Sequence, residues 1–238
     1  MNIYHISDLH IHPTRSDYMT SKFDPVLYKD QCDWVKIWND TITDDDIVII
    51  SGDTVWADKF GGSKPTLDII NKLNGKKKFI IKGNHDKWYN SATIRYHYNN
   101  IIPLDYSPYI IRNLMVVGSC GHTKVDKNKY NTGKNYLKLK LLLNNMSKLY
   151  EMSSYVKILV LHFKPDNEKI QDLIKKYNFN VVLYGHVHNC DDTELKYSKN
   201  GVKYYCSLAE RHNYKPVKIN SISLKHSLSC FKFNNNRL

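Results

Sequence analysis

Five short apolar segments, each followed within three residues by Asp, Asn or His, constrain the fold of this sequence more than any other feature. Short apolar runs that are rich in β-branched residues are typical of buried β-strands. In open α/β sheets, ligands bind beyond the carboxyl ends of the strands, so we expect the five sets of polar side chains to meet at one place. The predicted strands are residues 3–6, 47–50, 79–81, 157–161 and 181–184.

Helix-like segments separate most of these strands. Apolar residues in them recur at the spacing of an amphipathic helix. The expected helices are residues 26–42, 66–73, 135–150 and 170–177. Residues 109–111 and 114–117 are expected to pair as strands, and a strand–turn–strand pattern around 199–201 follows Asp192. No linker, repeat or low-complexity segment divides the chain, so we expect residues 1–238 to form one α/β domain with a β-rich C-terminal part.

The composition limits the classes of protein to which this chain can belong. Hydrophobic residues make up 42% of the chain, which is enough for a sizeable core. No apolar run is long enough to cross a membrane, and the N-terminus lacks a signal peptide pattern, so we expect a cytoplasmic protein without a membrane span. The five cysteines are widely scattered, which favours free thiols over disulfides or a Cys-based zinc site. The net charge of +12 either attracts a polyanion such as nucleic acid or reflects a general bias towards lysine.

The polar residues after the strands have the chemistry of metal ligands. Carboxylates, imidazoles and a neutral amide oxygen suit borderline and hard divalent cations. If Asp-x-His and His-x-His were extended, their alternate side chains would point to one side. Seven candidate ligands exceed one tetrahedral site and suit two metals that share a bridging carboxylate. These ligands are Asp8, His10, Asp53, Asn84, His162, His186 and His188.

Glycine precedes three of these ligands, Asp53, Asn84 and His186. A glycine at these points permits a tight exit from the strand and a close approach of the backbone. The same pattern also places His85 and Asp86 directly after Asn84. Asp86 alone could equally serve as the N-cap of a following helix.

This set of motifs resembles the calcineurin-like metallophosphoesterase superfamily, whose sequence blocks are all present here in the family order. The motifs are Asp8-x-His10, Gly52-Asp53, Gly83-Asn84-His85-Asp86, His162 and Gly185-His186-x-His188. Several segments further resemble bacterial predicted phosphohydrolases of unassigned substrate. The resemblance implies a four-layer αββα sandwich of two mixed β-sheets flanked by helices, with the site between loops at one edge of the sheets.

The resemblance also implies a role for each residue. Asp8, His10 and His188 would hold one metal, and Asn84, His162 and His186 the other, with Asp53 bridging the two. His85 would bind no metal but assist the leaving group, oriented by Asp86. Many family members carry an acidic residue or Asn where this chain has Trp56, a departure that removes no ligand.

The implied activity is hydrolysis of a phosphomonoester or phosphodiester by a water activated by two divalent metals. Mixed nitrogen and oxygen ligands suit Mn, Fe, Zn, Ni or Co, and we favour Mn. Two alternatives remain: a nuclease acting on DNA or RNA, which the basic charge favours, and a non-catalytic scaffold with the same fold. The expected partner is a phosphate-ester substrate, with nucleotides and nucleic acid among the candidates.

Other notable residues carry weaker signals. The run Lys76-Lys77-Lys78 is expected to be solvated, and the pair Tyr204-Tyr205 to lie in the core. The six lysines from Lys124 to Lys140 either are solvated or form a lip for an anionic substrate. His122 follows another predicted strand and is a candidate to reach the site.

Overall fold

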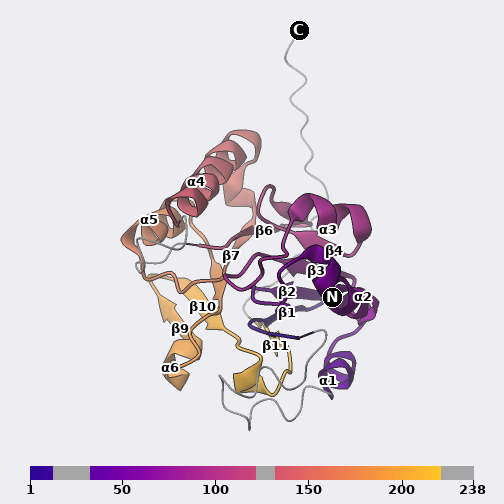
Figure 1. Ribbon diagram of the computed structural model, residues 1–238. Helices are drawn as coiled ribbons and strands as arrows, with labels where there is room; N and C mark the ends of the chain where they lie inside the picture. The colour runs from indigo at the N-terminus through magenta and orange to yellow at the C-terminus, as the bar shows by residue number, and fades with distance from the viewer. Residues whose placement is uncertain (13–32, 122–131, 221–238) are drawn as a thin grey trace.

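Two β-sheets form the centre of the molecule in this computed structural model, which describes residues 1–12, 33–121 and 132–220 (Figure 1). The first sheet has five strands in the order β11-β1-β2-β3-β4, and the second has six in the order β5-β6-β7-β8-β10-β9. Predicted features at residues 26–32, at His122 and from Lys124 to Lys129 lie outside the described residues.

The first sheet is parallel from β1 to β4, and β11 pairs with β1 in the antiparallel direction. Its strands are β1 (Ile3–Ile6), β2 (Ile47–Ile50), β3 (Lys77–Ile80), β4 (Ile101–Pro103) and β11 (Val217–Lys218). The carboxyl ends of β1, β2 and β3 therefore lie side by side. Three of the five predicted strand ends belong to this sheet.

The second sheet is parallel through β6, β7, β8 and β10, with antiparallel strands at both edges. Its strands are β5 (Tyr109–Ile111), β6 (Leu114–Ser119), β7 (Val156–Leu161), β8 (Val181–Tyr184), β9 (Lys196–Lys199) and β10 (Val202–Cys206). The predicted pairing of 109–111 with 114–117 is confirmed, as is the pair of strands around Asn200-Gly201.

Six α-helices flank the sheets in the described part of the chain. They are α1 (Trp34–Thr41), α2 (Phe60–Lys72), α3 (Ser91–His97), α4 (Thr132–Leu149), α5 (Glu168–Lys176) and α6 (Asp192–Leu195). In Figure 1, α1, α2 and α3 lie beside the first sheet, whereas α4 and α5 lie beside the second. Two short 3-10 helices, η3 (Met152–Ser154) and η4 (Glu210–His212), complete the described elements.

Three apolar cores separate four layers. Along β2, Val48 and Ile50 face a core shared with Trp38 and Leu67 of the helices, whereas Ile47 and Ile49 face the second sheet. This alternation follows from the two-residue period of a strand, and it explains why the run is apolar throughout. A third core joins the second sheet to α4 and α5. The predicted four-layer αββα sandwich is confirmed.

Some local expectations were wrong. Helix α2 begins at Phe60, earlier than the predicted Thr66. The sequence did not predict its first part because Gly61, Gly62 and Pro65 are poor helix formers. Lys78 is fully buried rather than solvated, and its Nζ donates hydrogen bonds to the carbonyl oxygens of Leu73 and Asn71, at the end of α2. This ammonium group satisfies carbonyls that a helix end leaves without partners.

Other expectations held. Tyr204 and Tyr205 are buried, as predicted, and the cysteines within the described residues, Cys120, Cys190 and Cys206, are free. Among the helices that the structure describes, none combines the length and the apolar character that a membrane span requires.

Candidate metal centre

Ligands predicted from the ends of five strands converge where the two sheets meet. Asp8 and His10 follow β1, Asp53 follows β2 and Asn84 follows β3, all in the first sheet, whereas His162 follows β7 and His186 and His188 follow β8 in the second. Backbone hydrogen bonds of Ser7 with Ser207 and Ala209 tie the end of β1 to the segment after β10. The two sheets are thus joined directly beside the predicted ligands.

The backbone of the ligands is strained. Nine described non-glycine residues have positive φ, and four of them are predicted ligands: Asp8 (56°), His10 (45°), Asp53 (49°) and His186 (70°). Such conformations cost free energy and cluster at functional sites. The expectation of an extended Asp-x-His was therefore wrong, because these side chains converge through turns rather than through strand alternation.

Asp8, His10 and His188 form the first group. The Nε2 atoms of His10 and His188 lie 3.6 and 3.5 Å from Oδ1 of Asp8. One ligand atom from each residue lies within 4.8 Å of the others. Asp8 and His10 are buried, and His188 is half-buried.

Asp53, His162 and His186 form the second group, again with ligand atoms within 4.8 Å of one another. The Nε2 atom of His162 lies 3.4 Å from Oδ2 of Asp53 and 2.7 Å from Oδ1 of Asn84. Asn84 therefore lies beside this group, and its role as a ligand stays a prediction.

Asp53 connects the two groups. Its Oδ2 atom lies 3.4 Å from His162 and also 3.8 Å from Nε2 of His10, which belongs to the first group. Its other oxygen, Oδ1, accepts a hydrogen bond of 2.8 Å from the backbone N–H of His85. One carboxylate oxygen is thus available to both groups while the other is held by the backbone.

The spacing between the aspartate oxygens and the histidine nitrogens within each group fits cation ligands better than direct hydrogen bonds, whereas Asn84 and His162 are in direct hydrogen-bond contact. Tetrahedral ligands at about 2.1 Å from a metal lie about 3.4 Å from one another, which is close to the 3.4–3.6 Å within each group. Oδ1 of Asp8 and Oδ2 of Asp53 are buried and have no hydrogen-bond donor among the described residues. Burial of a carboxylate oxygen without a partner costs free energy, and a bound divalent cation would provide a partner for each of these oxygens.

The charges of the two aspartates shape the protonation of the histidines. Burial alone would lower the pKa of His162, but the charge and the contact of Asp53 outweigh it and raise this pKa to about 9. Burial likewise opposes the contacts of Asp8 and Glu210 with His188, whose pKa nevertheless rises to about 10. The carboxylates therefore attract positive charge into the site.

Two glycines let the backbone pack against the carboxylates of Asp53 and Asp8. A Cβ atom on Gly83 would collide with the side chain and backbone N of Asp53. One on Gly185 would collide with Ser7 and with Oδ2 of Asp8. The predicted need for close backbone approach at these strand exits is confirmed.

Glu210 supports the site but was not predicted from the sequence. Its Oε1 atom accepts a hydrogen bond of 2.8 Å from Nδ1 of His188, which leaves Nε2 of His188 facing Asp8. A carboxylate that fixes the tautomer of a metal-binding histidine is a common supporting contact. Glu210 lies in η4, beyond the last recognised motif, so no sequence pattern pointed to it.

A buried histidine links the strands behind the ligands. His5 on β1 makes hydrogen bonds with Ser207 (2.9 Å) and Ser51 (2.7 Å), and it is fully buried. The carbonyl of Ser51 in turn lies 3.0 Å from Nδ1 of His162. Burial lowers the pKa of His5 to about 3, so this imidazole is neutral.

His85 stands at the open side of the site. Its side chain is 37% exposed, and its Nε2 atom lies 4.0 Å from Oδ2 of Asp53. The ring of Trp56 stacks on the imidazole with centroids 4.2 Å apart and planes inclined by 22°. Burial is the main cause that lowers the pKa of His85. Trp56, at which this chain departs from the family pattern, thus contacts His85, the predicted catalytic histidine.

Asp86 organises the loop around His85. Among the described residues, its oxygens accept hydrogen bonds from the backbone N–H groups of Gly83, Thr54 and Val55 and from the indole of Trp88. These contacts hold the loop that carries His85, and the orientation of the His85 imidazole by Asp86 stays a prediction. Asp86 also begins no helix, because the N-cap of α3 is Asn90. Burial, reinforced by Asp53, raises the pKa of Asp86 to about 6.

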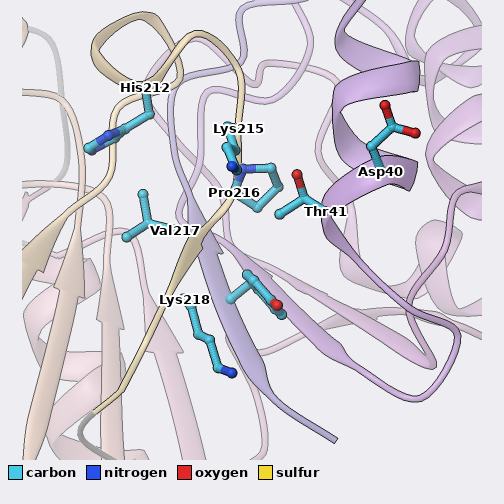
Figure 2. Close-up of a pocket in the computed structure, with 8 residues that line it drawn as sticks. Asp40, Thr41, His212, Lys215, Pro216, Val217 and Lys218 are labelled. Atoms are coloured by element: carbon cyan, nitrogen blue, oxygen red, sulfur yellow. The ribbon is translucent and has the colours of Figure 1, made fainter.

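A separate cavity of about 490 Å³ lies between α1 and β11 (Figure 2). Asp40 and Thr41 come from α1, and Pro216, Val217 and Lys218 line the opposite side. None of the seven predicted ligands lines this cavity. The chemistry of the metal groups is therefore not located there.

Among the solved structures, one with a TM-score above 0.5 supports the fold. TT1561 of Thermus thermophilus has a TM-score of 0.57 at 14% identity, over 92% of this chain and 98% of that one. AQ665 of Aquifex aeolicus, a protein of unknown function, has a TM-score of 0.49 at 15% identity, over 91% of this chain and 95% of its own. No curated protein matches the chain significantly. The family model of the calcineurin-like phosphoesterases matches residues 1–190 of the 238, and the chain therefore belongs to that family.

Proposed function

We propose that this protein is a binuclear metal-dependent phosphoesterase that hydrolyses a phosphomonoester or phosphodiester with water as the nucleophile. The position of Asp53 is the observation that carries the proposal, because one of its oxygens lies within 3.8 Å of a histidine from each ligand group. A shared carboxylate is what a two-metal phosphoryl-transfer site requires. Family membership supports the metal dependence and the phosphate-ester substrate.

Each group of side chains has a part in this proposal. Asp8, His10 and His188 would hold one cation, and Asn84, His162 and His186 would hold the other, with the carboxylate of Asp53 available to both. The cations supply Lewis-acid stabilisation of phosphate charge and activation of water. The donors are mixed nitrogen and oxygen, which fits Mn, Fe, Zn, Ni or Co, and Mn²⁺ is the first to test.

His85 acts on the leaving group. In an in-line displacement, water attacks phosphorus and the ester oxygen departs, which leaves that oxygen in need of a proton. In its protonated form, the His85 imidazole at the exposed side of the site, 4.0 Å from Asp53, is placed to donate this proton and becomes neutral. Trp56 stacks on the ring and limits its rotation, and Asp86 fixes the surrounding loop.

The full ligand set and His85 argue against a scaffold without catalysis. A nuclease remains an alternative because the net charge of +12 favours polyanions. We place the protein in the cytoplasm on the grounds given by its sequence.

The test is turnover of mono- and bis-nitrophenyl phosphate by the Mn²⁺-loaded protein, with a short oligonucleotide as a third substrate. We expect nitrophenol release that disappears in Asp53→Asn. Turnover equal to that of Asp53→Asn across all five metals would contradict the proposal. Strand cleavage that far exceeds nitrophenol release would favour the nuclease.

A further inference from the structure

A second cavity, of about 500 Å³, is lined by residues of α3 and α4 and by residues at the ends of β3 and β6. We call it the α3/α4 pocket. Its charged lining residues are Lys82, Arg95, Asp105 and Lys138. Its volume is within the usual range for small-molecule sites, about 300–1,000 Å³.

The α3/α4 pocket adjoins the second ligand group. Lys82 stands two residues before Asn84. Cys120, which also lines the pocket, accepts a backbone hydrogen bond of 3.3 Å from His162 through its carbonyl oxygen. Lys82 and Cys120 thus connect the lining of the pocket to the second ligand group through the chain and one backbone hydrogen bond, whereas none of the seven predicted ligands lines the pocket itself.

The pocket carries an excess of positive charge. Among the described residues, no carboxylate forms an ion pair with Lys82, Arg95 or Lys138. The one acidic lining residue, Asp105, already accepts hydrogen bonds from Tyr89 (2.7 Å) and Ser91 (2.6 Å). The lining thus has three positively charged side chains and one carboxylate that already accepts hydrogen bonds, so it attracts an anion.

Two of the cations are held in place by the protein. The Nη2 atom of Arg95 donates a hydrogen bond of 2.6 Å to the carbonyl of Pro103, which positions the rest of the guanidinium. Nζ of Lys138 lies 5.6 Å from the centre of the Tyr106 ring, which is 62% exposed. Positioned donors lose less entropy when they bind a ligand.

We propose that the α3/α4 pocket binds a second anionic group of the substrate, so that the preferred substrate is a small molecule with two phosphates rather than a simple monoester. The inference rests on the proposed phosphoesterase function. A volume of about 500 Å³ suits one compact molecule rather than a nucleic acid chain. Arg95 and Lys138 contact the second phosphate while the first lies at the metal centre.

The experiment compares fructose 1,6-bisphosphate with fructose 6-phosphate, using the Mn²⁺-loaded full chain. The test variant is Arg95→Ala/Lys138→Ala, and the control is Lys199→Ala/Lys203→Ala, which removes the same charge from exposed positions of the β9–β10 pair. Hydrogen bonds to charged groups are worth about tenfold or more each. We expect KM for the bisphosphate to rise about tenfold or more in the test variant alone, with kcat/KM for the monophosphate unchanged.

Calorimetric binding of pyrophosphate separates this inference from the proposed function. If wild type hydrolyses neither the sugar phosphates nor the nitrophenyl phosphates, the proposed function fails, yet weaker pyrophosphate binding in the test variant than in the control would still support an anion site. An equal loss for both sugar phosphates, or pyrophosphate binding equal to that of the control, would overturn the inference. Lys138→Ala alone, which leaves the contact of Arg95 with Pro103 intact, guards against misfolding of the double variant.

Discussion

Glu210→Gln should weaken one metal site and leave the other intact. The carboxylate of Glu210 is 10% exposed and binds Nδ1 of His188 at 2.8 Å, whereas no described ligand of the second group contacts it. Gln keeps an oxygen acceptor of the same size but removes the charge that makes the imidazole a stronger ligand. Loss of such supporting contacts costs about 10–100-fold in metal affinity, or about 1.4–2.7 kcal/mol.

The measurement is a calorimetric titration of the metal-free protein with Mn²⁺, fitted to two sites. We expect one dissociation constant to rise at least tenfold and the other to stay within twofold of the wild-type value, with no change in circular dichroism. Glu151→Gln, the same substitution at an exposed position, is the control and should match wild type. Two unchanged sites, or equal weakening of both, would refute the role assigned to Glu210.

Three further predictions concern catalysis, packing and pH. His85→Ala should lower kcat by about 10²–10⁴-fold, as expected for a general acid, with the metal content by elemental analysis unchanged; a loss of bound metal would contradict this role. Gly83→Ala should abolish metal binding because its Cβ would displace Asp53, whereas Gly61→Ala, in open space, should bind metal normally. Because the pKa of His5 falls to about 3 in the folded protein, only the unfolded chain takes up this proton between pH 6.5 and pH 3. Stability should therefore fall with decreasing pH in that window, by up to about 1.4 kcal/mol per pH unit, and urea unfolding of His5→Asn should lack this contribution.

The sequence predicted the strands and the convergence of their ends because both follow from local rules. Apolar runs such as residues 47–50 must be buried on two faces, and parallel strands bring their carboxyl ends together. The sequence could not predict how the side chains are aimed. Asp8 and His10 meet through left-handed turns, and these depend on the backbone packing at Gly185 and on the contacts of Ser7 with the segment after β10.

Side-chain contacts that exist only in the folded protein were the other source of error. Lys78 looked like part of a solvated run, yet the end of α2 lies over β3 and receives its ammonium group. Glu210 lies 22 residues beyond His188, in a short helix with no motif. Neither contact has a periodic or compositional signature, since both arise only when the sheets and helices pack.

The division of the ligands between the sheets has a consequence for how the protein unfolds. Each ligand group contains side chains from both sheets, so an ion bound to either group would cross-link the two sheets. Separation of the two sheets would then require release of both ions. The melting temperature would therefore rise with the fraction of these sites that is occupied. Each tenfold excess of free metal over the dissociation constant would add about 1.4 kcal/mol per site to the unfolding free energy.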